Sequence, residues 1–160
     1  MIFLTVGSQM PFDRLVSAVD RWADHAGRSD VFAQIGDSLL KPKAIEYTKS
    51  LSPAQFTDRV ASAELVVAHA GMGSILTALV YAKPLVLLAR RGDLLETRND
   101  HQLSTAKWLG RRSGIFVADS DKEIGECIEA GLREAGPVRP IDDHASDELI
   151  ERIAEFIVES

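Results

Sequence analysis

Short apolar runs alternate along the chain with longer segments in which apolar residues recur every three or four positions. Five runs are rich in Val, Ile, Leu and Phe, as in strands buried on both faces of a sheet, and they lie at residues 2–6, 31–35, 65–68, 85–88 and 114–117. A sixth, short strand is expected at 44–48. The alternation predicts an α/β fold with one Rossmann-like, doubly wound parallel sheet.

Residues that favour helix ends divide the periodic segments. Pro11 suits the first turn of a helix that stops at Gly27, and Ser52 with Pro53 opens another. Ser74 is the expected N-cap of the helix that carries Ile75, Leu76, Leu79 and Val80. Helical spacing resumes with Leu103, Ala106, Trp108 and Leu109, and again from a cap at Ser120 or Asp121 to Leu132.

The last part of the chain, residues 141–160, is expected to contain a terminal amphipathic helix over 145–158. Its apolar stripe comprises Leu149, Ile150, Ile153, Phe156 and Ile157. Such a stripe docks on the domain's own core, or it binds a partner or a membrane surface. Asp and Glu on the polar face disfavour anionic lipid.

The segment from His69 to Ser74 links a buried strand to a helix through a glycine-rich turn. Gly71 and Gly73 let a ligand approach where a Cβ would block it, and unpaired amides with the helix dipole favour an anion. The alternative is that the glycines serve the turn alone. The turn lacks both the phosphate-loop pattern and the full dinucleotide fingerprint, so neither a P-loop ATPase nor a standard dinucleotide site is supported. The loop after the first strand, Gly7-Ser8-Gln9, offers a second such place.

A polar segment follows the strand at 85–88, at the sheet edge where open α/β folds bind ligands. Asn99, Asp100, His101 and Gln102 are predicted to form the first turn of the next helix. Asn99 or Asp100 alone would suffice as a cap. Four consecutive hydrogen-bonding side chains exceed what a cap needs, so His101 or Gln102 is expected to contact a ligand.

Composition narrows the function classes. At 160 residues the chain suits one domain, 1–160, and its net charge of -6 disfavours a broad nucleic-acid surface, although a local basic cluster at Arg90, Arg91 and Arg98 is compatible with it. Cys127 is the single cysteine, which offers no disulfide framework or zinc pattern and fits a reducing cytosol. No apolar run reaches the ~20 residues of a membrane span, and no signal peptide is expected at the N-terminus.

Several motifs, taken together and in this order, resemble one family. They are Thr5-Val6-Gly7-Ser8-Gln9, then 11–16, His69 to Ile75, Lys83-Pro84-Leu85 and 98–102. The set is similar to the C-terminal, donor-binding half of family 28 glycosyltransferases of the GT-B fold, in its stand-alone form. The likeness extends to polysaccharide-biosynthesis subunits related to the cytosolic subunit of the dolichol-linked N-acetylglucosamine transferase.

The resemblance implies a UDP-sugar donor lying across the carboxyl edge of the sheet. Gly7, Ser8 and Gln9 would face the phosphates, as would Gly71, Met72, Gly73 and Ser74 at the helix start. Asn99, His101 and Gln102 would bind the sugar hydroxyls or the diphosphate. His69 would face the reacting sugar as acid, base or electrostatic stabiliser, or it merely packs at the strand end. The resemblance implies no cofactor and no metal.

One position departs from the family pattern. Related enzymes often carry a ribose-binding carboxylate on the helix after the glycine turn, where this chain has Thr77. A hydroxyl binds less strongly than a carboxylate, and Glu96 is a candidate substitute.

A GT-B active site lies between two domains, of which this sequence supplies one. The resemblance therefore implies a membrane-associated partner subunit that binds a lipid-linked saccharide acceptor, with this chain cytoplasmic and peripheral at the inner face of the membrane. The expected function is hexosyl transfer from a UDP-sugar in exopolysaccharide biosynthesis, with little activity by the chain alone. The alternative is a nucleotide-sugar-binding module without catalysis, and homo-oligomerisation stays open.

Overall fold

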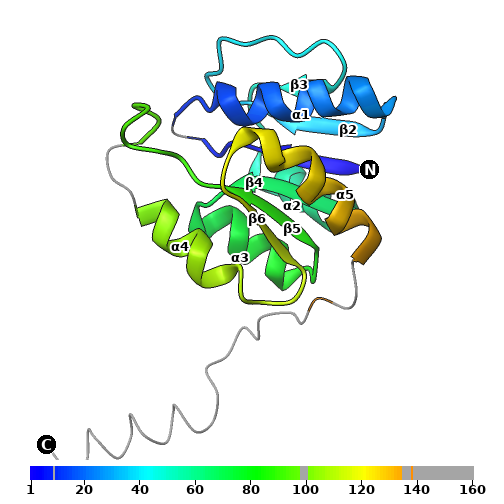
Figure 1. The fold of residues 1–160 in the computed structure, drawn as a ribbon. Coiled ribbons are helices and arrows are strands. Elements are labelled where there is room, and N and C mark those ends of the chain that lie inside the picture. The colour runs from blue at the N-terminus through cyan, green and yellow to red at the C-terminus, as the bar shows by residue number, and fades with distance from the viewer. Residues whose placement is uncertain (9, 98–100, 135–137, 139–160) are drawn as a thin grey trace, which may run out of the picture.

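Six parallel strands form one sheet, with the strand order β3-β2-β1-β4-β5-β6 (Figure 1). The computed structural model describes residues 1–8, 10–97, 101–134 and 138, with the backbone alone at His101. The strands are β1 (Ile2–Thr5), β2 (Val31–Gln34), β3 (Glu46–Thr48), β4 (Leu65–His69), β5 (Leu85–Leu88) and β6 (Ile115–Ala118). The order reverses direction between β1 and β4, and it is at such a point that doubly wound sheets bind ligands.

Helices cover both faces of the sheet (Figure 1). They are α1 (Asp13–Ala26), α2 (Pro53–Ser62), α3 (Met72–Val80), α4 (His101–Leu109), the short 3-10 helix η1 (Asp121–Glu123) and α5 (Ile124–Glu134). Helices α1 and α5 lie together on one face, and α2, α3 and α4 lie on the other. The predicted α/β class and its doubly wound parallel sheet are confirmed.

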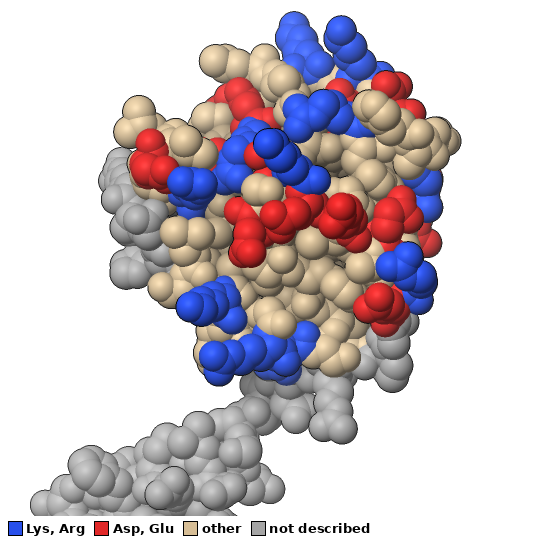
Figure 2. Space-filling view, in the orientation of Figure 1, with Lys and Arg blue, Asp and Glu red and all other residues tan. Residues whose placement is uncertain are grey.

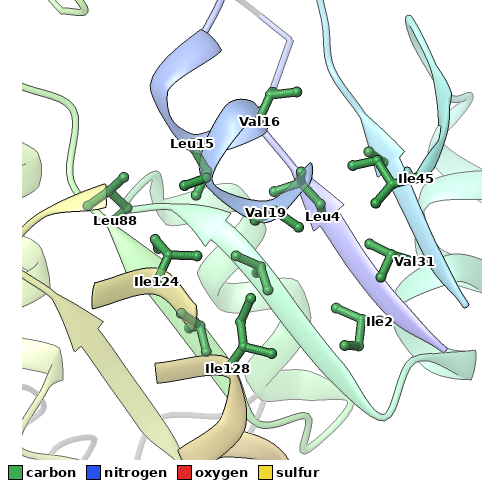
Figure 3. Packing of buried hydrophobic residues seen from close by; sticks show 14 of the residues in the cluster. Ile2, Leu4, Leu15, Val16, Val19, Val31, Ile45, Leu88, Ile124 and Ile128 are labelled. Atoms are coloured by element: carbon green, nitrogen blue, oxygen red, sulfur yellow. The ribbon is translucent and has the colours of Figure 1, made fainter. Parts of the chain in front are cut away.

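Alternate strand residues feed two separate cores. Ile2 and Leu4 of β1 pack against Leu15 and Val19 of α1 and Ile128 of α5 (Figure 3). The residue between them points the other way, and Phe3 joins a second cluster with α2, α3 and α4. Since successive side chains of a strand point to opposite faces, apolar runs such as 65–68 supply both cores.

Helix ends agree with the sequence prediction in two places. Ser52 caps α2 in a full capping box with Gln55, and Pro53 stands in the first turn. Gly27 ends α1 with a left-handed φ of 63°.

The expected cap at Ser74 is wrong. The cap lies three residues earlier, at Gly71, and helix α3 begins at Met72. Ser74 is buried inside the first turn. Core contacts of Ile75, Ala78 and Leu79 stabilise the helix, and they outweigh the low helix propensity of Gly73 in its first turn.

The last two helices differ in detail from their predicted forms. The segment after β6 opens as η1, whose N-cap Ser120 makes no side-chain capping bond, before α5 continues from Ile124. On α4, Ala106 and Leu109 are buried as expected, but Trp108 is 65% exposed. No helix in the described ranges combines the length and apolar character needed to cross a membrane. The predicted terminal helix at 145–158, within 141–160, lies outside the described residues.

Candidate functional site

A cavity of about 460 Å³ opens at the carboxyl edge of the sheet, where β1 and β4 lie side by side. It is lined by Val6, Gly7, Ser8, Met10, His69, Gly71, Met72, Gly73, Ser74, Arg90, Thr97 and Gln102. The loops after β1, β4 and β5 therefore meet in one place, as the sequence predicted. Its position at the switch point is where this architecture places a ligand.

The loop after β1 turns sharply at Gly7, whose φ of 76° favours glycine. The Gly7 amide donates to the hydroxyl of Thr5 at 3.2 Å, and that hydroxyl donates to Gln34 at 3.1 Å. The Gly7 amide is thus occupied within the loop. Ser8 is exposed and lines the cavity.

The N-terminus of α3 forms the opposite wall. The amides of Met72, Gly73 and Ser74 precede the first intrahelical bond, which runs from the Ile75 amide to the Gly71 carbonyl. No side chain caps this end. A Cβ added at Gly73 would meet nothing within 4 Å. Three amides and the positive end of the helix dipole therefore lie in this wall of the cavity, an arrangement that favours an anion.

The ring of His69, at the end of β4, lies between Gly7 and Gly71. A Cβ at Gly7 would come within 2.7 Å of Cε1, and a Cβ at Gly71 would overlap the ring itself. The glycines therefore make room for the imidazole as well as for the turns. The ring lines the cavity, as expected if His69 acts on a ligand.

Burial of the ring and, to a lesser degree, the charge of Arg90 lower the pKa of His69 to about 4. The Thr5 backbone opposes the shift, yet the buried Nδ1 has no hydrogen bond of acceptable geometry within the described residues. His69 is therefore neutral near pH 7. A neutral imidazole can accept or donate a hydrogen bond, but it is a poor general acid.

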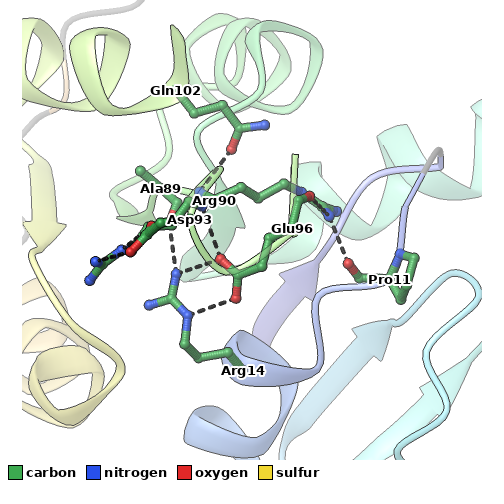
Figure 4. A network of polar contacts seen from close by, with 8 residues as sticks. Pro11, Arg14, Ala89, Arg90, Asp93, Glu96 and Gln102 are labelled. Carbon is green, nitrogen blue, oxygen red and sulfur yellow. Dashed lines mark hydrogen bonds and ion pairs between the residues drawn. The ribbon is translucent and has the colours of Figure 1, made fainter. Parts of the chain in front are cut away.

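Arg90, two residues after the end of β5, connects two of the loops (Figure 4). Its guanidinium donates to the carbonyls of Val6 at 2.8 Å, Met10 at 2.6 Å and Pro11 at 2.7 Å, all in the loop after β1. A fourth bond reaches the carbonyl of Glu96 at 3.1 Å. Burial lowers the pKa of Arg90, and the Glu96 carboxylate opposes this. The side chain holds the loop in shape.

Arg14 and Glu96 form a second link between the same regions (Figure 4). Two bonds of 2.8 Å join the Arg14 guanidinium to the two carboxylate oxygens, and Arg14 also donates to the Ala89 carbonyl at 3.0 Å. The amide of Arg91 donates to Glu96 as well. Glu96 is thus bound within the fold and does not line the cavity, which argues against the expected role as a ribose ligand.

The structure brings most of the predicted donor residues together. Gly7, Ser8, Gly71, Met72, Gly73, Ser74, His69 and Gln102 all line the cavity. The Gln102 Oε1 accepts from the Arg90 amide at 3.2 Å, so the oxygen end of this side chain is fixed at the cavity wall. Thr77 is not among the lining residues, and its hydroxyl donates to the Gly73 carbonyl at 2.9 Å. Gln9, Asn99 and the side chain of His101 lie outside the described residues.

Sequence reasoning missed Val6, Met10, Arg90 and Thr97 as cavity-lining residues. Val6 directly follows β1, and Thr97 lies in the loop that precedes α4. The available signal was therefore their position after a strand and before a helix. The predicted basic cluster is not formed by the side chains described: Arg90 binds backbone carbonyls and Arg91 pairs with Asp93, while Arg98 lies outside the described residues. Across the ranges described, no three His, Cys, Asp or Glu side chains gather as a metal site would require.

The sheet order, with a cavity at its switch point, defines a Rossmann-like α/β domain. Residues 1–135 match the Glycosyltransferase family 28 C-terminal domain, and the chain belongs to this family. The predicted family and its glycosyltransferase class are thereby confirmed.

Relatives and solved structures agree with this assignment. The chain is 30% identical over 125 residues to the human UDP-N-acetylglucosamine transferase subunit ALG13. The matched region covers 72% of this chain and 11% of that protein. A solution structure of ALG13 has a TM-score of 0.60 at 19% identity, covering 95% of this chain and 93% of that one. The Methanocaldococcus jannaschii UDP-GlcNAc 2-epimerase, solved with UDP-GlcNAc and UDP, has a TM-score of 0.64 at 14% identity, covering 97% of this chain and 45% of that one. These structures support the expected fold, that of one half of a GT-B enzyme.

Proposed function

We propose that this chain is the donor-binding and catalytic subunit of a two-component glycosyltransferase, and that it transfers a hexosyl group from a UDP-sugar to a lipid-linked acceptor in exopolysaccharide biosynthesis. The observation that carries the proposal is the cavity in which the loop at Gly7 and Ser8 faces the uncapped start of α3. Membership of family 28 and the likeness to a UDP-N-acetylglucosamine transferase subunit support the choice of donor.

The donor diphosphate would lie against the amides of Met72, Gly73 and Ser74. These amides are preorganised by α3, so they can stabilise the negative charge that grows on the departing UDP. Ser8, Thr97 and Gln102 line the same cavity and would bind sugar or phosphate oxygens. Gln9, Asn99 and His101 keep the roles that the family resemblance gives them, and no metal is proposed.

In the transfer step an acceptor hydroxyl would attack the anomeric carbon of the donor sugar. The bond from that carbon to the UDP oxygen breaks, its electron pair leaves with UDP, and the acceptor proton passes to a base. We assign neutral His69 to the cavity as a hydrogen-bonding group near the sugar. With a pKa of about 4 it is a weak base, although a bound diphosphate would raise that pKa. The stronger base would come from the partner.

The acceptor side of the active site would be supplied by a separate membrane-associated subunit. A GT-B active site needs two facing domains, and residues 1–135 match the C-terminal, donor-binding one. In this arrangement the chain is cytoplasmic and reaches the inner face of the membrane through its partner. The isolated chain would bind donor weakly and transfer little sugar, so appreciable turnover by the pure chain would overturn the two-component proposal.

Calorimetric titration tests the donor site. UDP, UDP-glucose, UDP-glucuronate and UDP-N-acetylglucosamine should bind, whereas ADP and GDP should not. Gly73→Asp places a carboxylate in open space beside the three amides, so we expect uridine binding to be lost while the fold is kept. Gly73→Asn is the matched neutral control and should retain most of the affinity. Equal binding by the Asp and Asn variants, or no preference for uridine, would contradict the proposal.

A non-catalytic nucleotide-sugar-binding module is the second candidate, favoured by the Thr77 hydroxyl, which binds its own helix instead of facing the cavity. The two candidates differ in what His69→Ala does in the complex reconstituted with the partner. A catalytic subunit should lose transfer more than donor affinity. If the chain is only a binding module, the reconstituted complex would show no sugar transfer through this site, whether position 69 is His or Ala.

A further inference from the structure

The chain between β2 and β3 arches over α1 as a loop (Figure 1). We call residues 36–45 the β2–β3 loop. Its Leu39 is 89% exposed, more than any other large apolar side chain in the described part of the chain. From there the exposure alternates, as along an extended backbone: the side chains at 40 and 42 turn inward, and Lys41 and Lys43 are exposed. The outward side of the loop therefore carries one leucine and two lysines.

Two carboxylates of α1 hold the β2–β3 loop. The Ser38 hydroxyl donates to Asp13 at the start of the helix. Asp20, two turns further along α1, accepts from the amide of Lys43 at 3.0 Å and from that of Ala44 at 2.8 Å. The loop is thus bonded to the helix on either side of Leu39, and the fold itself keeps this side chain on the outside.

The outward side of the β2–β3 loop is locally basic in an acidic protein. Residues 36–49 contain three Lys against one Asp and one Glu, whereas the whole chain has a net charge of -6. The Asp is Asp37, which pairs with Lys49 at 2.7 Å, and the Glu is exposed at the start of β3. In Figure 2, blue side chains project at the top of the molecule, where Figure 1 shows the loop. Since Asp37 is already paired, Lys41 and Lys43 are left for an anionic surface.

A hollow of about 430 Å³ lies between the β2–β3 loop and the edge strand β3. Its lining includes Leu39, Lys41, Tyr47 and Lys49, and Tyr47 is 42% exposed. Lysine and tyrosine side chains have an apolar body and a polar end, so they can bury the first while the second stays in water. Such a lining fits a phosphate headgroup that is attached to an acyl chain.

The β2–β3 loop starts at the same edge of the sheet as the cavity. A Cβ at Gly36 would lie 3.4 Å from the Gly7 carbonyl oxygen, so the first residue of this loop contacts the cavity loop after β1. Strands β1 and β2 are parallel neighbours, and both loops therefore leave carboxyl ends. A surface that binds the β2–β3 loop would thus lie on the side of the molecule where the candidate site opens.

We propose that the β2–β3 loop binds the surface of a bilayer that contains anionic phospholipid. Leu39 enters the acyl layer, while Lys41 and Lys43 stay with the headgroup phosphates, as the length of the lysine side chain allows. One exposed leucine is too little apolar area for the core of a protein–protein interface, but shallow insertion beside basic residues suits a lipid surface. A contact of this size is weak and reversible, so it orients the domain, and firm anchoring needs a second attachment. The proposal does not depend on the proposed function.

Fluorescence of a label at position 39 tests insertion in the full chain. Cys127 is the single cysteine, so Cys127→Ser with Leu39→Cys gives one thiol for the environment-sensitive dye NBD. With phosphatidylcholine vesicles that contain phosphatidylglycerol, we expect NBD emission to rise about two-fold, because the dye moves from water into the acyl layer. Leu95→Cys in the same background is the matched control, because Leu95 is 86% exposed but lies in the loop after β5. No rise at position 39, or an equal rise at both positions, would overturn the proposal.

Vesicle sedimentation tests the lysines. Lys41→Gln and Lys43→Gln should each weaken binding to the phosphatidylglycerol vesicles about five-fold. Lys107→Gln and Lys122→Gln remove the same charge at exposed positions outside the loop, and each should change binding less than about two-fold. Circular dichroism should show that all variants are folded.

Three outcomes of these measurements contradict membrane binding by the loop. Equal losses in the two pairs of lysine variants would show that only the net charge matters. Equal binding to vesicles without phosphatidylglycerol would remove the role of the lysines. A rise in NBD emission with protein concentration alone, without vesicles, would assign the loop to a second copy of the chain.

Discussion

The imidazole of His69 occupies the place that a Cβ at Gly71 would take. Gly71 has an ordinary extended backbone, with φ of -91° and ψ of 134°, so the conformation itself does not require glycine. The requirement comes from the ring of His69. One residue of the predicted glycine turn therefore depends on the candidate catalytic residue two positions before it.

Gly71→Ala should destabilise the protein by about 1–3 kcal/mol, because the ring or the start of α3 must move. The same substitution in a His69→Ala background should cost less than about 0.5 kcal/mol, since the obstacle is gone. Urea unfolding of the four proteins measures this coupling. Additive costs would show that His69 is not the reason for glycine at this position.

Gly73→Ala is the matched control for Gly71→Ala. A Cβ at Gly73 meets nothing within 4 Å, and alanine is the better helix former. We expect stability to be unchanged or to rise by up to about 1 kcal/mol. If Gly73→Ala lowered the unfolding free energy as much as Gly71→Ala does, contact with His69 would not explain the requirement for glycine at position 71.

The lowered pKa of His69 makes stability depend on pH. Between about pH 6.5 and 4 the unfolded chain binds a proton at His69 that the folded chain does not, so folding weakens as pH falls through this window. Between pH 7.5 and 4 the wild type should lose up to about 3 kcal/mol more than His69→Gln. Urea titrations of both proteins give the difference, and parallel pH profiles would refute the assignment.

Arg90→Lys should destabilise the protein by about 2–4 kcal/mol although the charge is kept. One ammonium group cannot reproduce four hydrogen bonds to carbonyls in two loops, and buried carbonyls would be left unpaired. Arg21→Lys is the control, because Arg21 forms an exposed pair with Asp121 and should change stability by less than about 0.5 kcal/mol. Thermal unfolding compares the two, and similar shifts would show that Arg90 is not a special anchor.

Glu96→Gln separates a structural role from ribose binding. The substitution weakens the two-bond pair with Arg14, so we expect a loss of about 1–3 kcal/mol in unfolding free energy. The ratio of affinities for UDP and 2′-deoxy-UDP should match that of the wild type. A ratio that collapses in the variant would return Glu96 to the ribose.

The fold could be predicted from sequence because its signals are local. Runs such as 85–88 are apolar on both faces, and Ser52 and Gly27 carry their own capping chemistry. The prediction at Ser74 was wrong because it relied on a local signal alone. Ser74 has a side chain suited to capping, yet the position of helix α3 is fixed by packing of Ile75 and Leu79 against the sheet.

The candidate site was only partly accessible to the same reasoning. Glycine turns after strands have a recognisable spacing, so Gly7, Gly71 and Gly73 could be found. The role of Arg90 could not be predicted, because its partners are backbone carbonyls far away in sequence. Every residue has a backbone carbonyl, so the sequence does not show which ones bind a side chain. Glu96 is a candidate ribose ligand by sequence because Thr77 replaces the usual carboxylate, and its pairing with Arg14, 82 positions away, is not visible in the sequence.

The anchoring of the cavity walls also bears on how this domain can diversify. Arg90 and Arg14 fix the loops through bonds to carbonyls and to Glu96. Exchanges at cavity-facing positions such as Ser8, Met72 and Thr97 leave those bonds in place. A change of ligand preference therefore requires only a few substitutions on the cavity surface, because the hydrogen bonds that hold the loops do not involve those side chains.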